Sequence, residues 1–198
     1  IATRTEKMHL VKNEVHGDID WLEKVCKDRE GIVVPSNHDC FFARWIMETD
    51  WRRDPDNASF YLETAKVMVD SAKMTEGGAH RVDPFIYWVE RLYEGDNLRC
   101  LKTDESFTLA GIELGLHGDK GPNGARGSRN NLRRIGVKTI IGHSHSPGIE
   151  EGCYQTGTST PLRLEYNSGP SSWMNAHCIL YPNGKRSLVF IIDGDWRF

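Results

Sequence analysis

The chain has 198 residues, of which 38% are hydrophobic and 27% are charged, and its formal net charge is −3. This length fits one domain, and the composition excludes a disordered tail, a collagen-like rod and a coiled coil. No apolar run approaches the ~18 residues of a membrane span, so no membrane partner is expected. The small net charge excludes a bulk polycation, so any phosphate binding must depend on a local basic patch.

Five cysteines occur, and none of them is spaced as Cys-x-x-Cys. The odd number argues against a disulfide framework and against a cysteine zinc site. A reducing, cytoplasmic setting is therefore expected. The chain begins at Ile1 rather than Met, which suggests that an upstream part has been removed.

The first half of the chain is predicted to be mainly helical. Helices, marked by apolar residues at steps of three and four, are expected at residues 5–29, at 41–74 with a break at Asp54-Pro55, and from Pro84 to Gly95. The short apolar run 31–35 predicts a buried strand, and residues 75–82 are expected to form a loop.

The second half has the pattern of strands separated by turns. Strands are expected at residues 98–101, 107–109, 112–116 and 137–141, followed by an all-β tail over 152–198 with a hairpin around Pro182–Lys185. A glycine-rich loop at 118–127 and a short basic helix at 128–135 interrupt them. Helices and strands thus alternate in the order of an α/β fold.

Three polar clusters directly follow apolar strands. They are Asn37-His38-Asp39, His117, and His143-Ser144-His145. Ligands bind at the carboxyl ends of strands in open α/β sheets, and imidazole with a carboxamide oxygen suits Mn, Fe or Zn. Each histidine taken alone is more often structural, but the order of all three clusters predicts a metal site.

These clusters resemble the motifs of calcineurin-like metallophosphoesterases. Residues 36–39 (Ser-Asn-His-Asp) are similar to the GNHD motif with Ser in place of Gly, residues 117–119 to the next histidine motif, and residues 142–145 to the GHxH motif. The resemblance runs from about residue 30 to 195. The segments at 34–39, 121–128 and 169–173 resemble phage-encoded members of this family, which include proteins linked to DNA transfer or degradation.

The resemblance implies an α/β sandwich of two mixed sheets flanked by helices. Residues 1–198 would form a single domain that lacks its first strands, with a helical insertion at 41–95 and a C-terminal β segment at 152–198. It also implies two divalent metal ions, with Mn expected and Fe, Zn or Mg as alternatives. Asn37, His117 and His143 would bind one ion and His145 the other, while His38 would be the catalytic residue beside the scissile phosphate.

The sequence departs from the family pattern upstream of residue 30. The pattern needs an Asp-x-His motif and a bridging Asp, and no Asp-x-His occurs in the chain. Glu14-Val15-His16 and Gly17-Asp18 are the nearest matches, but both fall inside an expected helix. We therefore expect a fragment whose first strands lie upstream of Ile1. The alternative is a degenerate, metal-poor homologue.

Basic residues are concentrated between His117 and His143. Guanidinium groups and the backbone amides of a glycine-rich loop suit phosphate oxygens, so Lys120, Arg126 and Arg129 are predicted to bind the substrate phosphate. The alternative is a solvated helix face. Aromatic side chains at helical spacing, Trp45, Trp51 and Trp88, are interpreted as core residues rather than as a base-stacking platform.

Together these features predict metal-dependent hydrolysis of phosphodiester bonds by a DNA nuclease of phage type, acting on DNA in the host cytoplasm. A phosphomonoesterase or protein phosphatase is the alternative within enzymes, because the same metal core supports both. A non-catalytic binding piece is the alternative outside enzymes. A second copy of the chain, or the upstream segment of the same protein, are further expected partners.

Overall fold

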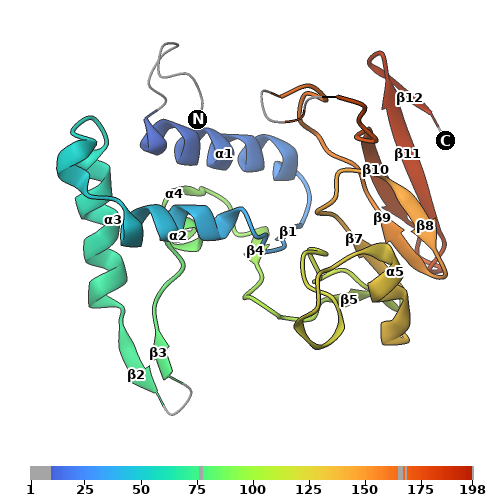
Figure 1. The fold of residues 1–198 in the computed structure, drawn as a ribbon, viewed down its shortest axis with the longest axis horizontal. Coiled ribbons are helices and arrows are strands. Elements are labelled where there is room, and N and C mark those ends of the chain that lie inside the picture. Colours follow the sequence, from blue (N-terminus) through green and yellow to red (C-terminus); the bar gives the residue numbers. More distant parts are fainter. Residues whose placement is uncertain (1–9, 76–77, 165–166, 168, 198) are drawn as a thin grey trace. The chain divides into compact units, whose positions relative to one another are not determined.

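A computed structural model describes residues 10–75, 78–164, 167 and 169–197 (Figure 1). The chain divides into two compact units. Unit 1 comprises residues 1–33 and 37–100, and unit 2 comprises residues 34–36 and 101–198. The single domain over 1–198 stays a prediction.

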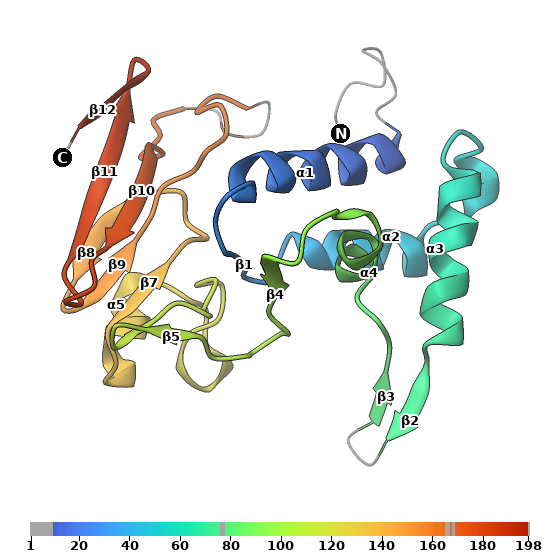
Figure 2. The same ribbon diagram turned by 180° about the vertical axis from the view of Figure 1, so that it is seen from behind.

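Unit 1 is mainly helical, and Figure 2 shows its helices from behind. Its helices are α1 (Val11–Cys26), α2 (Asp39–Glu48), the 3-10 helix η1 (Trp51–Arg53), α3 (Ala58–Asp70) and α4 (Pro84–Leu92). Its strands are β1 (Gly31–Val33), β2 (Lys73–Thr75), β3 (Gly78–His80) and β4 (Leu98–Cys100). β1 and β4 pair in parallel, and β2 and β3 pair as an antiparallel hairpin.

The core of unit 1 forms where three helices meet. Its buried side chains are Val15 and Ile19 from α1, Phe60 from α3, and Trp88 and Val89 from α4. The indole Nε1 of Trp88 donates to the Thr64 hydroxyl at 3.1 Å, and that hydroxyl donates to the Phe60 carbonyl at 2.8 Å. Every polar atom of this buried pair is therefore bonded, and the interpretation of Trp88 as a core residue is confirmed.

The helices predicted for unit 1 are present, with the expected break between α2 and α3, but they are shorter than predicted. α1 ends at Cys26 and α3 ends at Asp70, and the predicted helical residues 73–74 lie in β2. Two other predictions are correct only in part. The expected buried strand at 31–35 ends at Val33, and Ile32 is 36% exposed because a two-stranded sheet covers little of it. The expected loop at 75–82 is partly the β2–β3 hairpin, whose residues 76–77 lie outside the described part.

Unit 2 contains a mixed sheet in the order β5-β6-β7-β9-β8 and a second sheet in the order β10-β11-β12. The strands of the mixed sheet are β5 (Thr108–Leu109), β6 (Ile112–Glu113), β7 (Thr139–Ile141), β8 (Gly148–Glu150) and β9 (Cys153–Gln155). Those of the second sheet are β10 (Asn175–Leu180), β11 (Arg186–Ile192) and β12 (Asp195–Arg197). The helices are η2 (Pro122–Gly124), α5 (Arg129–Leu132) and η3 (Arg133–Ile135).

The mixed sheet of unit 2 has a parallel centre. β6, β7 and β9 run in parallel, whereas β5 and β8 are antiparallel to their neighbours at the two edges. α5 lies in the connection from β6 to β7, so these elements form a β-α-β crossover. Leu132 of α5 packs with Ile141 and Cys153 from two adjacent strands, which fixes the helix on the sheet.

Arg186 at the start of β11 joins the two sheets of unit 2. Its Nη1 donates to the carbonyls of Thr139 at 2.8 Å and Gly152 at 2.6 Å, and its guanidinium lies 4.1 Å from the ring centroid of Tyr154. These contacts satisfy two carbonyls and hold the β10–β11 hairpin on the mixed sheet.

The β predictions are confirmed for the hairpin around 182–185, where Leu180 pairs with Arg186. The prediction of an all-β tail is wrong for the described residues of 156–174, where the only β pairing is an isolated bridge from Thr158 to Asn175. A mixed α/β architecture is confirmed, and the sandwich of two mixed sheets stays a prediction. None of the helices in the described residues combines the length and apolar character needed to cross a bilayer.

Candidate functional site

The candidate site lies at the carboxyl edge of the parallel strands of unit 2. β7 ends at Ile141 and is paired in parallel with β6 and with β9, which ends at Gln155. The chain after β6 stays beside β7, because the Gly142 amide donates to the His117 carbonyl at 2.8 Å. The β-α-β crossover therefore brings the two histidine motifs of unit 2 to one edge of the sheet.

The rings of His117 and His143 meet at this edge. Their centroids lie 5.2 Å apart with an interplanar angle of 76°. The ring of His145 instead packs edge to face on Trp173, with centroids 4.3 Å apart. Three of the ligands predicted from the resemblance belong to unit 2. Two of them, His117 and His143, lie next to each other, and the third, His145, packs against Trp173.

The backbone at this motif is strained. His143 has φ 74° and His145 has φ 59°, both in the left-handed region that residues with a Cβ rarely adopt. Backbone bonds hold them there, since the Ser144 amide donates to Gly142 O at 3.0 Å and the Met174 amide donates to His145 O at 3.2 Å. Two strained residues in one three-residue segment are typical of a site whose geometry is fixed by its surroundings.

The segment 172–174 supports the histidine motif from one side. Besides the backbone bond of Met174 and the ring contact of Trp173, the hydroxyls of Ser172 and Ser146 are 2.7 Å apart and hydrogen-bonded. Three contacts of different kinds therefore fix His145 and Ser146.

The glycine-rich loop closes on its own backbone. The Gly127 amide donates to Asp119 O at 2.7 Å, and a Cβ at Gly127 would overlap with the carbonyl of Gly118. Only glycine permits this close approach of two backbone segments. The loop is further closed by an antiparallel bridge between Lys120 and Arg126.

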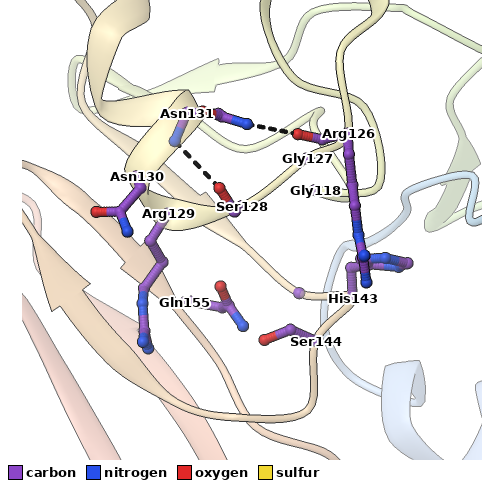
Figure 3. A pocket seen from close by; sticks show the side chains of 11 residues that line it. Gly118, Arg126, Gly127, Ser128, Arg129, Asn130, Asn131, His143, Ser144 and Gln155 are labelled. Atoms are coloured by element: carbon purple, nitrogen blue, oxygen red, sulfur yellow. Dashed lines mark hydrogen bonds between the residues drawn. The ribbon is translucent and has the colours of Figure 1, made fainter.

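A cavity of about 490 Å³ opens between this loop, α5 and the edge of the sheet (Figure 3). Its lining includes His143 and two of the predicted phosphate-binding residues, Arg126 and Arg129. Neutral polar side chains line the rest, namely Ser128, Asn130, Asn131, Ser144 and Gln155. In Figure 3 the side chain of Arg126 extends from the loop toward the level of His143. The cavity therefore joins cationic groups to one member of the imidazole pair.

The basic run predicted from the sequence divides into two groups. Arg129 lines the cavity, and its Nη1 donates to Ser146 O at 3.1 Å. Arg133 instead bonds Glu150 and Glu151, each at 2.9 Å, and Lys120 pairs with Asp104 at 3.2 Å. Arg133 is neutralised by these acidic groups, whereas Arg126 and Arg129 present their charge to the cavity.

Asn37 and His38 belong to unit 1, at the start of α2. The His38 ring lies 5.2 Å from that of Phe41, and His38 lines a cavity of about 340 Å³ together with Asp18 and Asp39. Burial, and secondarily the Asp39 carboxylate, raises the pKa of Asp18 above its usual value. Asp18 and His16 lie within α1, as expected from the sequence.

The imidazole pair has part of the donor set of a metal site. Two rings 5.2 Å apart provide two nitrogen donors for a borderline divalent ion. Within the described residues no group of three or more His, Cys, Asp or Glu side chains gathers to hold an ion. The pair therefore fits part of a site and provides two of its ligands.

The chain is similar to a phage protein, Protein A1 of Escherichia phage T5. The two are 34% identical over 177 residues, which are 87% of this chain and 31% of that protein. The chain thus spans about a third of the length of its relative. No protein-family model and no solved structure matches the chain. This similarity confirms the expected relationship to phage proteins.

Sequence reasoning missed two residues of the site. Gln155 is the last residue of β9 and lines the cavity with an exposed fraction of 2%. A polar residue that ends a short strand next to the histidine strand is the signal that could have indicated it. Trp173 lies in the segment 169–173 that resembles phage-encoded proteins, but its contact with His145 depends on tertiary structure.

Proposed function

We propose that the protein is a metal-dependent phosphoesterase that hydrolyses phosphodiester bonds, with DNA as its substrate. The observation that supports this most directly is the cavity of unit 2, where His143, next to His117, faces the same space as Arg126 and Arg129. Imidazole nitrogens can hold a divalent ion, and guanidinium groups bind phosphate oxygens. The motif resemblance and the similarity to a phage protein support the same function.

In this proposal His117 and His143 hold a divalent ion, with Mn as the expected ion. By resemblance alone, Asn37 completes that site and His145 holds a second ion. A metal bound there supplies a Lewis acid and lowers the pKa of its bound water.

The remaining steps fall to side chains of this chain. Arg126 and Arg129 neutralise the phosphate and orient it toward the histidines. His38, assigned by resemblance alone, protonates the leaving oxygen as the ester bond breaks. Because a diester carries one negative charge per phosphate, two guanidinium groups also suit the neighbouring phosphates of a polynucleotide.

A non-catalytic binding piece is the second candidate, favoured by the lack of a three-residue metal group within the described residues. The test is an assay of the chain with added Mn²⁺, with bis-p-nitrophenyl phosphate, p-nitrophenyl phosphate and plasmid DNA as substrates. We expect turnover of the diester and of DNA that EDTA abolishes and that His143→Ala removes. The matched control is His177→Ala, since His177 is exposed on β10.

Each outcome of that assay separates the candidates. Turnover of the monoester alone would favour a phosphatase. DNA binding without turnover of any substrate would favour the binding piece. Turnover that persists in His143→Ala would contradict the proposed site.

A further inference from the structure

Gln155 is a buried amide at the floor of the unit 2 cavity. Its exposed fraction is 2%, and the only side-chain hydrogen bond that it makes within the described residues runs from Nε2 to Ser146 O at 3.0 Å. A carbonyl oxygen only accepts, so the amide nitrogen must face Ser146. The Oε1 atom then faces the other way, and Figure 3 shows it directed toward Ser128, inside the ring of lining residues.

Arg129 bonds to the same carbonyl. Its Nη1 donates to Ser146 O at 3.1 Å, so the guanidinium and the Gln155 amide lie side by side. The guanidinium also packs on the backbone of Gly148, where a Cβ would overlap with it. One rigid backbone segment therefore fixes a donor group and an acceptor oxygen next to each other.

This arrangement is unsuited to a phosphate alone. A phosphodiester has only acceptor oxygens, and it would be repelled by the Oε1 of Gln155. Leaving that oxygen without a donor when a ligand displaces water would weaken binding, because a buried acceptor would remain unsatisfied. The ligand part that reaches the floor must therefore bring an N–H or O–H donor for Gln155 and an acceptor for Arg129.

The edges of nucleobases have this pattern, with an N–H donor beside an acceptor. A cavity of about 490 Å³ lies in the range of pockets that enclose one small ligand. The Watson–Crick edge of a base is free to enter it only where that base is unpaired. Neutral amides of Asn130 and Asn131 line it further, as expected for a base rather than a second phosphate.

We propose that this cavity binds a single unpaired nucleobase next to the phosphate held by Arg126 and Arg129. Gln155 accepts from the base edge, and Arg129, whose guanidinium has several N–H donors, donates to that edge as well as to the phosphate. The inference rests on the proposed function, because it takes a nucleic acid as the substrate. It adds that the substrate is single-stranded or has an unpaired nucleotide at the site.

The test compares two oligonucleotides of equal length in the presence of EDTA. One carries bases, and the other carries abasic sugars on the same phosphate backbone. By fluorescence anisotropy, the chain should bind the base-bearing strand roughly 10-fold more tightly, the scale of one good base contact. Gln155→Leu should lose most of this advantage while its affinity for the abasic strand stays unchanged. His177→Ala, at an exposed position on β10 outside the cavity, is the control and should keep the advantage.

Equal affinity of the wild-type chain for the two strands would overturn the inference, and so would an advantage that survives in Gln155→Leu. If that variant does not fold, saturation-transfer NMR on wild-type protein with dAMP replaces it. The base protons should then receive more saturation than the sugar protons, and the reverse would contradict a base subsite. A base advantage without hydrolysis of any phosphoester would reject the proposed function while leaving this subsite in place.

Discussion

His117 and His143 meet edge to face with ring centroids 5.2 Å apart, although a loop and a helix separate them in the chain. Their contact follows from the β6-α5-β7 crossover, which places the segments after two parallel strands at one edge of the sheet. The bond from the Gly142 amide to the His117 carbonyl sets this spacing. The imidazole pair is therefore a consequence of the topology of unit 2.

If this pair holds a divalent ion, replacing either ring should weaken binding of that ion. We expect His117→Ala and His143→Ala to lower Mn²⁺ affinity by at least about 10-fold, since even residues that only orient ligands contribute that much. Isothermal titration calorimetry measures the change. His177→Ala, on the exposed face of β10, should bind the ion like the wild-type chain. Equal losses in all three variants would show that the effect is not specific to the pair.

Arg126 and Arg129 are expected to hold a polynucleotide backbone. Neutralising both to Gln should weaken DNA binding at all sequences alike. The slope of log affinity against log salt should shrink by about one to two, because each phosphate contact releases close to one counterion. A salt titration on duplex and single-stranded DNA measures this slope.

The structure provides a matched control for that titration. Arg133 belongs to the same basic run, but Glu150 and Glu151 already neutralise it. Arg133→Gln should therefore leave the slope unchanged. An unchanged slope in the double variant as well would mark the loop as a solvated surface and favour the phosphatase function.

Local pattern predicted most of the elements. The helices of unit 1 follow from apolar residues such as Val15 and Ile19 at helical spacing, and those side chains do form its core. Strand β7 follows from its β-branched residues, and the hairpin after β10 follows from Pro182-Asn183-Gly184. In each case one local signal determines the structure.

What the sequence did not predict depends on tertiary contacts. The β2–β3 hairpin lacks an alternating apolar pattern, and β8 is a three-residue edge strand without a strong signal. Gln155 faces the cavity only because β9 pairs with β7, and Arg133 differs from Arg129 only through its acidic neighbours. Such partners are distant in sequence, so spacing alone does not reveal them.

Gly127 should be essential for the loop that borders the cavity. A Cβ there would overlap with the carbonyl of Gly118, which is backbone and cannot move aside like a side chain. We expect Gly127→Ala to cost about 1–3 kcal/mol in the free energy of unfolding and to weaken DNA binding. Urea denaturation measures the first effect.

Gly142→Ala is the matched control for that variant. A Cβ at Gly142 would lie 3.7 Å from its nearest neighbour, His117 O, which is an ordinary contact. Its free energy of unfolding should change much less, although it adjoins the histidine motif. Equal destabilisation by the two substitutions would contradict the assigned role of the Gly118–Gly127 approach.

His38 is the proposed proton donor. If this role is right, His38→Ala should keep Mn²⁺ affinity and lower kcat by roughly 100-fold, the usual scale of general acid catalysis. The loss should be smaller for a substrate with a good leaving group, such as a nitrophenyl ester, because that oxygen needs no proton. Steady-state kinetics on both substrate types measure the difference. A parallel loss of metal affinity would identify His38 as a ligand instead.

Asp18 provides a test that depends on pH. Its carboxyl group has a pKa raised above 3.8 by burial and by the nearby Asp39 carboxylate. The ionised form is thus disfavoured in the folded state. The resulting loss of stability is absent below the unfolded pKa and develops as the pH rises through the folded pKa.

Asp18→Asn should therefore raise the free energy of unfolding at pH 7 and leave it nearly unchanged at pH 3. The gain should stay below about 1 kcal/mol, because the carboxyl group is only partly withdrawn from water and the solvent that still reaches the side chain screens its charge. Urea denaturation at the two pH values measures it, with Asp20→Asn on the same helix as the control for net charge. Asp18→Asn should also retain the Mn²⁺ affinity of the wild-type chain. A gain at pH 3 that equals the gain at pH 7 would show that ionisation is not its cause, and a loss of metal affinity would show that Asp18 is a ligand.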